Sequence, residues 1–207
     1  MLLNTRLQRR VNIGRVNDQW AIGLDAWIIQ DGNYPDLTRS QHAEFAIEFW
    51  PSSELAPSTE TAPSVHHVKD SEYDVCARII AITQKCWVLD FGIQVFQDSA
   101  CPISLSVGDW VTGRVGLGVD PFMYFERLAK DPGIPALVYP WSIDRITLQT
   151  APFVPGGGGV LVRDETRLGW IEIEQTHAWT DDDGHGSYLL QCTLQPGEPG
   201  RSSTTST

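Results

Sequence analysis

Apolar side chains that recur at every second position are the feature of this sequence that most limits its fold, because that period places them on one face of a β-strand. In Glu44–Trp50, apolar residues at 45, 47 and 49 alternate with glutamates at 44 and 48. Trp20–Asp31 carries apolar residues at both sets of positions, which predicts a strand covered on both faces. The same criterion predicts further strands over Tyr73–Thr83, Cys86–Phe96, Trp110–Val119, Trp141–Thr150 and Val160–Arg163.

One short helix is expected among these strands, over about residues 121–130. Asp120 is suited to cap its N-terminus, and Pro121 fits its first position because proline lacks an amide hydrogen that the first turn does not use. Asp131-Pro132-Gly133 ends it. Farther along, the turn residues 181–184 predict a hairpin that joins Gly169–Trp179 to Ser187–Leu194.

The predicted fold class is therefore mainly β: a curved antiparallel sheet or OB-like barrel with one short helix (about 121–130) and additional flanking strands. The order of elements over Tyr73–Thr150, three curved strands followed by a short helix and more strands, is similar to that of an OB barrel. An Ig-like sandwich or another partly open barrel would give a similar pattern.

A length of 207 residues fits one domain of ordinary size. The predicted organisation is an N-terminal basic arm (1–19), a short β block packed on the main domain (20–50), a Pro/Ser/Thr-rich loop or linker (51–70), the main β domain (71–195) and a disordered tail (196–207).

The charge balance argues against nucleic acid as a partner. Fifteen Lys and Arg stand against 26 Asp and Glu, which gives a net charge of −11. Phosphate neutralisation supplies most non-specific nucleic-acid affinity, so this chain would repel a polyanion on average. The four arginines of the first fifteen residues leave −15 for the rest, a field suited to a basic protein partner or to solubility alone.

Four cysteines (76, 86, 101 and 192) are scattered without a Cys-x-x-Cys pair. Residues 1–18 contain no apolar run typical of a secretory signal, and no segment reaches the ~20 apolar residues of a membrane span. We therefore expect reduced thiols, a cytoplasmic location and no membrane association; the oligomeric state stays open.

Signature motifs of common enzyme classes are missing. No Gly-Lys pair exists for a phosphate-binding loop, and neither Gly-x-Ser-x-Gly nor His-Glu-x-x-His occurs. The sequence therefore predicts no cofactor and leans away from an enzyme, although a catalytic triad assembled from distant residues stays open.

Two groups of polar residues are candidates for ligand binding or catalysis. His177, Asp181–Asp183 and His185 could hold a metal ion, but their spacing does not fit an EF-hand, so an acidic turn with no metal is predicted. Charged residues inside apolar strands could pair across strands or act as general acids or bases: Asp25, Arg78, Asp90, Arg114, Asp144 and Arg145.

Eight tryptophans lie in or beside the predicted strands. We expect five or six of them in the core and the others on a surface that binds a partner, since tryptophan anchors protein interfaces and stacks on bases or sugars. The candidate binding residues are Trp27, Trp110, Arg78 and Arg114.

Three functions remain in view. The first is a non-enzymatic protein-binding module of the inhibitor or immunity type, in which acidic groups steer a basic partner and tryptophans anchor it. The second is an OB-type single-stranded nucleic-acid binder, which requires that Arg78, Arg114, Arg127 and Arg145, or the N-terminal arginines, cluster on one face. The third is a small-molecule-binding protein or enzyme with a site at a barrel mouth, lined by Asp90, Asp144 or His177.

Overall fold

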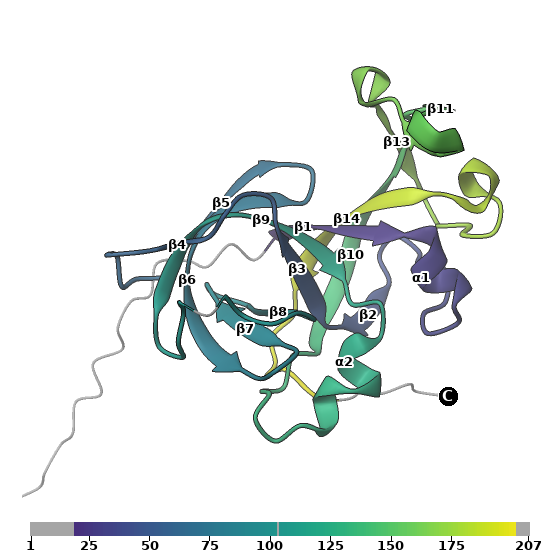
Figure 1. The fold of residues 1–207 in the computed structure, drawn as a ribbon. Coiled ribbons are helices and arrows are strands. Elements are labelled where there is room, and N and C mark those ends of the chain that lie inside the picture. Colours follow the sequence, from purple (N-terminus) through teal and green to yellow (C-terminus); the bar gives the residue numbers. More distant parts are fainter. Residues whose placement is uncertain (1–18, 103, 202–207) are drawn as a thin grey trace, which may run out of the picture.

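A computed structural model describes residues 19–102 and 104–201. Within these residues one sheet of twelve strands contains a closed five-stranded barrel, which occupies the left half of Figure 1. In ring order the barrel strands are β9 (Trp110–Val119), β3 (Ile47–Pro51), β8 (Gln94–Gln97), β7 (Trp87–Asp90) and β6 (Glu72–Ile82), with β6 pairing again with β9.

The remaining strands of this sheet flank the barrel. They are β1 (Gln19–Asp25), β14 (Ser187–Leu194), β10 (Tyr139–Gln149), β13 (Trp170–Ile173), β2 (His42–Phe45), β4 (Ala56–Pro57) and β5 (Ser64–Lys69). Strand β1 meets β9 at one parallel bridge, Gly23 opposite Gly118, and pairs along its length with β14. We call β1, β14, β10, β13 and β2 the flanking sheet; it continues from the barrel wall toward the right of Figure 1. Strands β4 and β5 extend the barrel on its other side.

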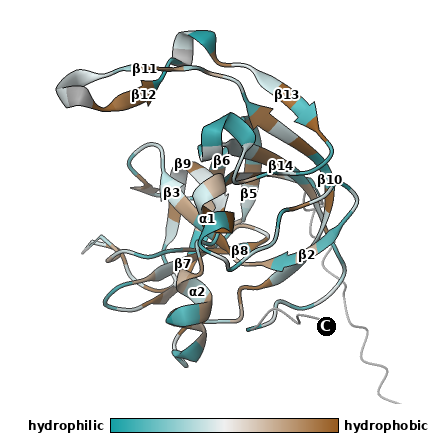
Figure 2. Cartoon of the chain, turned by 90° about the vertical axis from the view of Figure 1, so that its right-hand side faces the viewer, coloured by the Kyte–Doolittle hydropathy of each residue, from teal (hydrophilic) through white to brown (hydrophobic). Residues whose placement is uncertain are grey.

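Short helical segments and one hairpin complete the described chain. They are α1 (Ala26–Gln30), α2 (Met123–Glu126), the 3-10 turns η1 (Leu128–Lys130), η2 (Gly157–Gly159), η3 (Glu165–Arg167) and η4 (Asp181–Gly184), and the hairpin of β11 (Phe153–Pro155) and β12 (Leu161–Arg163). Figure 2 shows this hairpin standing away from the body. Arg163 ties its base to the body by donating to the carbonyls of Ala151 (2.8 Å) and His185 (2.7 Å).

The barrel interior and the inner face of the flanking sheet share one hydrophobic core. Its largest fully buried side chains include Trp20, Trp87 and Trp141. A second core lies outside β7 and β8, where Tyr124 of α2 packs near Phe96 with ring centroids 6.2 Å apart. The predicted mainly β fold with a barrel, a short helix near 121–130 and flanking strands is confirmed.

The strand order differs in detail from the expected order. The N-terminal block supplies barrel strand β3, and the helix follows the last barrel strand, so that β10 lies outside the ring. Cys86–Phe96 is a hairpin of β7 and β8 rather than one strand, because Gly92 turns the chain with φ 118°. The N-terminal block therefore contributes one strand, β3, to the ring, while its strands β1 and β2 flank the barrel.

Two N-terminal predictions need correction. Residues 20–31 do not form one strand: β1 ends at Asp25 and α1 follows, which buries Ile28 and Ile29 and leaves Trp27 exposed. Glu44–Trp50 is divided at Ala46, after which the chain leaves β10 and joins β9. Alternation of apolar residues does not reveal a change of strand partner.

The predicted connections also change. The loop or linker over 51–70 contains β4 and β5, which extend the sheet at β9 and β6. Strands β13 and β14 do not form the expected hairpin, because each pairs with β10. The described part of the predicted tail is ordered by a bridge between Gly200 and Val138. Residues 1–18 of the basic arm and 202–207 of the tail lie outside the described residues.

Tyr73 connects the barrel to the flanking sheet. Its hydroxyl accepts a hydrogen bond from the Ala21 amide at 2.6 Å and lies 3.3 Å from the Ala21 carbonyl, to which it donates. Tyr73 belongs to β6 and Ala21 to β1, so this single buried group satisfies main-chain atoms of a strand that β6 does not pair with.

We expect Tyr73→Phe to lower the free energy of unfolding by about 1–3 kcal/mol, since it leaves buried main-chain groups unsatisfied. Tyr34→Phe is the matched control, because the Tyr34 hydroxyl is buried without a hydrogen-bond partner among the described residues. Urea denaturation of both variants tests this; equal losses of stability would contradict the proposed role of the Tyr73 hydroxyl.

Candidate functional site

A cleft of about 360 Å³ opens where the flanking sheet leaves the barrel. One wall comes from β3 and β9 of the barrel, and the other from β1, α1, β14 and the ends of β10 and β13. Its lining residues are Gly23, Leu24, Asp25, Trp27, Ile28, Glu48, Trp50, Asp70, Ser71, Gly118, Val119, Pro121, Gln149, Trp170, Ser187, Tyr188 and Leu189. The volume lies within the range of small-ligand sites, about 300–1,000 Å³.

The indole of Trp50 packs against two glycines of β9, which leave room for it because they have no side chains. A Cβ at Gly116 would overlap the five- and six-membered rings of this indole, and one at Gly118 would lie 2.9 Å from it. Both glycines belong to β9, opposite Trp50 and Glu48 of β3. The indole therefore rests close to the main chain, while Trp50 as a whole remains 45% exposed. This arrangement leaves part of a rigidly supported ring open to a ligand.

Two further indoles line the same cleft. Trp27 projects from α1 with half of its surface exposed, while its neighbour Ile28 is buried. Trp170 begins β13 and is half-buried, opposite Gln149 in the register with β10. In the described part of the chain none of the three rings forms an aromatic pair.

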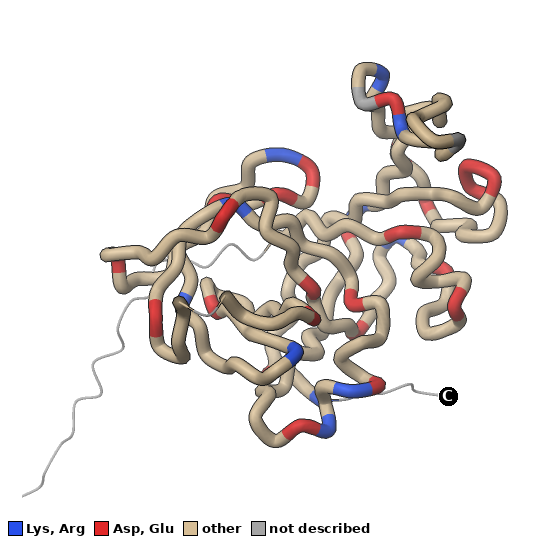
Figure 3. The backbone as a smooth tube through the Cα atoms, viewed as in Figure 1, with Lys and Arg blue, Asp and Glu red and all other residues tan. Residues whose placement is uncertain are grey.

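The charged residues of the cleft are all acidic. Asp25, Glu48 and Asp70 line it, and none of its described lining residues is Lys, Arg or His. Figure 3 shows acidic positions in the barrel and in the flanking sheet alike. Because low-dielectric walls focus the field of such groups, the cleft favours positively charged ligands.

Glu48 connects the cleft to a buried carboxyl group. Burial raises the pKa of Glu48, and the nearby charge of Asp98 raises it further, although an amide hydrogen bond from Asp98 opposes the shift. Burial also raises the pKa of Asp120 to about 7, with Glu48 and Asp98 contributing repulsion. The Asp120 oxygens accept the Tyr124 amide at 3.1 and 3.3 Å. The helix α2 nevertheless begins at Met123 with Phe122 at its N-cap, so the predicted cap at Asp120 and first helical position at Pro121 were wrong.

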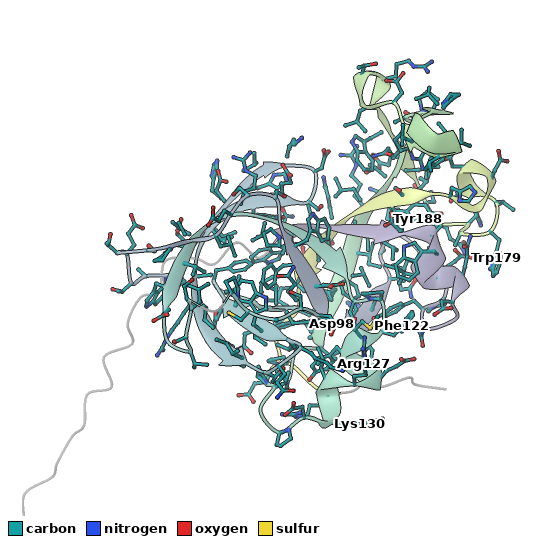
Figure 4. All side chains as sticks on the ribbon, viewed as in Figure 1. Asp98, Phe122, Arg127, Lys130, Trp179 and Tyr188 are labelled. Atoms are coloured by element: carbon teal, nitrogen blue, oxygen red, sulfur yellow. The ribbon has the colours of Figure 1, made fainter. Side chains whose placement is uncertain are left out.

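Arg127 partly balances this acidic group. Its guanidinium donates to Asp98 at 2.9 Å, beside α2 (Figure 4). On the opposite side of the cleft, Tyr188 donates its hydroxyl to Asp181 at 2.9 Å. Neither contact involves the three carboxylates of the cleft.

Of the four predicted binding residues, only Trp27 lies in this cleft; Asp25, one of the charged strand residues singled out from the sequence, lines it as well. The other three, Arg78, Trp110 and Arg114, lie on the outer face of the β6–β9 ladder, where Arg78 is opposite Trp110. Arg114 is bound by Asp74 through two nitrogens at 2.8 and 3.1 Å. A second surface hollow beside this pair, of about 390 Å³, is lined by Ser52, Ser53, Asp74, Thr112, Gly113 and Arg114.

The other arginines that a nucleic-acid surface requires are paired as well. Arg127 binds Asp98 and Arg145 binds Glu172 at 2.8 Å. These pairs come from separate elements, and each neutralises a guanidinium. The geometry thus gives no support to a cluster of free arginines among 78, 114, 127 and 145.

The acidic turn near 181–183 has structural contacts. Asp181 accepts the His177 amide at 2.7 Å besides the Tyr188 hydroxyl, and Asp182 forms an ion pair with Arg163. The described residues contain no group of three or more His, Cys, Asp or Glu side chains arranged for a metal ion.

The expected number of core tryptophans was wrong. Three are buried (Trp20, Trp87 and Trp141), whereas Trp27, Trp50 and Trp179 are exposed, and Trp110 and Trp170 are half-buried. Sequence reasoning missed Trp50, Trp170, Glu48 and Asp70 as cleft residues. The signal that pointed toward Trp50 was the pair Gly116 and Gly118 on one strand face, which predicts a close approach.

Comparisons with protein-family models, curated proteins and solved structures find no match to this chain. No helix among the described residues has the length and apolar character needed to cross a membrane. The site must therefore be interpreted from its own chemistry.

We expect Gly116→Ala to displace the Trp50 indole, because the added methyl group would occupy its place. The displaced ring should shift its indole N–H resonance and lower the free energy of unfolding by about 1 kcal/mol or more. Gly157→Ala is the control, since a Cβ there meets nothing within 4 Å. An unchanged Trp50 resonance in Gly116→Ala would contradict the close packing.

Asp120 should make folding stability depend on pH. Its pKa rises from 3.8 to about 7 on folding, so the folded state retains a proton that the unfolded state has lost. The contribution of Asp120 to the free energy of unfolding is therefore fully present below pH 4. It is lost as the pH rises toward 7, and the loss is about 4 kcal/mol at most.

Asp120→Asn removes this contribution, and its stability should fall less than that of the wild type between pH 4 and 7. Denaturant titrations at a series of pH values measure the difference. Glu126→Gln, at an exposed position on the same helix, should leave the pH profile unchanged; a profile of Asp120→Asn parallel to the wild type would show that Asp120 is not the titrating group.

Proposed function

We propose that this protein is a binding module whose cleft holds a basic segment of a partner protein. The observation that carries the proposal is the placement of three indoles and three carboxylates around one cleft without a basic side chain. Aromatic faces attract cations through their quadrupole, and carboxylates attract them by charge, so both kinds of group favour the same ligand.

The wider molecule supports a protein partner. A net charge of −11 would speed the approach of a basic protein and repel nucleic acid. Rigid aromatic groups in a concave site are typical of the residues that dominate binding energy at protein interfaces. An inhibitor or immunity-type protein that covers a basic surface is one form that this function could take.

The test compares binding of a lysine- and arginine-rich peptide of about ten residues with that of its glutamate counterpart. We expect the wild type to bind the basic peptide only, with an affinity that falls as salt is added, because exposed charges are screened. Trp50→Ala should weaken binding about tenfold or more, as is typical of a central aromatic residue.

Trp179→Ala is the matched control. Trp179 is 70% exposed but does not line the cleft, and it lies at the outer edge of the molecule in Figure 4. Equal affinity of the wild type and Trp50→Ala, or equal binding of the acidic peptide, would refute the proposed function. Isothermal titration calorimetry measures both.

A further inference from the structure

The cleft surface is composed mainly of two kinds of group. Apolar surface comes from Leu24, Ile28, Val119, Pro121, Leu189 and the three indoles, and negative charge comes from Asp25, Glu48 and Asp70. Neutral polar groups come from Ser71, Gln149, Ser187 and Tyr188, and the Tyr188 hydroxyl is already bonded to Asp181. A ligand that fits this surface carries positive charge and apolar area on the same atoms.

The three indoles of the cleft belong to ordered elements of the fold. Trp50 lies against the main chain at Gly116 and Gly118, and Trp27 is attached to a helix that buries Ile28 and Ile29. Trp170 is part of the β13–β10 ladder. Because the Trp50 ring packs on the main chain and the other two indoles are carried by ordered elements, less conformational freedom is lost when a ligand binds.

The negative groups differ in their exposure. Asp25 is exposed and keeps its hydration, whereas Glu48 is half-buried between β3 and the cleft. Burial raises the pKa of Glu48, which means that its charged form lacks solvation. A cation in the cleft would supply that missing stabilisation without having to donate a hydrogen bond.

We infer that the cleft receives an N-methylated ammonium group carried by a lysine side chain of the partner, held between the indoles of Trp27, Trp50 and Trp170 and beside Glu48. This inference rests on the proposed function and names the chemical group that the site selects. Aromatic cages of this composition suit such groups, because the methyl groups carry the positive charge onto the ring faces.

An unmodified ammonium or guanidinium group fits less well. Each keeps several N–H donors that require hydrogen-bond acceptors, which an indole face does not provide. Methylation removes donors, lowers the cost of leaving water and adds apolar surface that the indoles can bury. The cleft should therefore prefer trimethyllysine to lysine.

The experiment uses the whole chain and four probes. Three are versions of one peptide whose other residues are uncharged, with lysine, trimethyllysine or the uncharged carbon analogue of trimethyllysine at the centre. The fourth probe is free choline. Affinities come from calorimetry, and the indole N–H resonances locate the site. We expect the trimethyllysine peptide to bind about tenfold more tightly than the lysine peptide and the carbon analogue, and more tightly than choline.

Variants separate the contributions of charge and ring. Glu48→Gln should reduce the preference for trimethyllysine over its carbon analogue, since the two differ only in charge. Trp50→Ala should weaken the trimethyllysine peptide about tenfold or more, whereas Trp179→Ala should leave its affinity unchanged.

Equal affinities for lysine and trimethyllysine, both lost in Trp50→Ala, would overturn this inference and leave the proposed function standing. Choline binding as tightly as the trimethyllysine peptide would overturn the assignment to a protein side chain. If neither these probes nor the basic peptide binds in a manner that depends on Trp50, the proposed function itself is refuted.

Discussion

The structure depends on strand β9, which closes the barrel and forms part of one wall of the cleft. It pairs with β3 on one side and with β6 on the other, so the ring cannot close without it. At Gly118 it also meets β1 and thereby joins the flanking sheet to the barrel. Glycine at 116 and 118 weakens a strand in isolation, because it has no side chain to pack. Here the missing side chains are replaced by the indole of Trp50, so one ring fills the space and lines the cleft.

The barrel and the flanking strands share one core but are joined by few hydrogen bonds beside the cleft. Beyond the bridge at Gly23, the link between β6 and β1 is the Tyr73 hydroxyl on the Ala21 main chain. Strand β1 then continues beside β14, while β9 turns into α2 at Asp120. The barrel and the flanking strands diverge at this point, which leaves a cleft between them. The cleft is a consequence of the topology, and its tryptophans cover apolar surface that the divergence would otherwise expose to water.

Much of the fold was predictable because a strand can be recognised from the alternation of apolar residues within a short segment. The extent of β9 follows directly from alternation over Trp110–Val119. The presence of a short helix after it was also predictable, although α2 begins at Met123 with Phe122, and not Asp120, at its N-cap. Strand partners were not predictable, because pairing between β3 and β9 depends on contacts far apart in the chain. The division at Ala46 and the pairing of both β13 and β14 with β10 belong to this class. For the same reason one predicted binding residue, Trp27, falls in the cleft, whereas Arg78, Trp110 and Arg114 share a different face.

The structure shows where the acidic residues of the chain lie and which of them are paired with arginines. A net charge of −11 spread evenly would affect solubility and little else. Several acidic residues are instead balanced within the fold, as Asp74 is by Arg114 and Asp98 by Arg127. The cleft carboxylates lie beside the indoles, and burial together with the charge of Glu48 raises the pKa of the buried Asp120 to about 7. A bound cation would lower the electrostatic repulsion between Glu48 and Asp120, so ligand binding and the ionisation of the buried carboxyl group must be linked thermodynamically. By the same linkage, deprotonation of Asp120 must strengthen the attraction of the cleft for a cation.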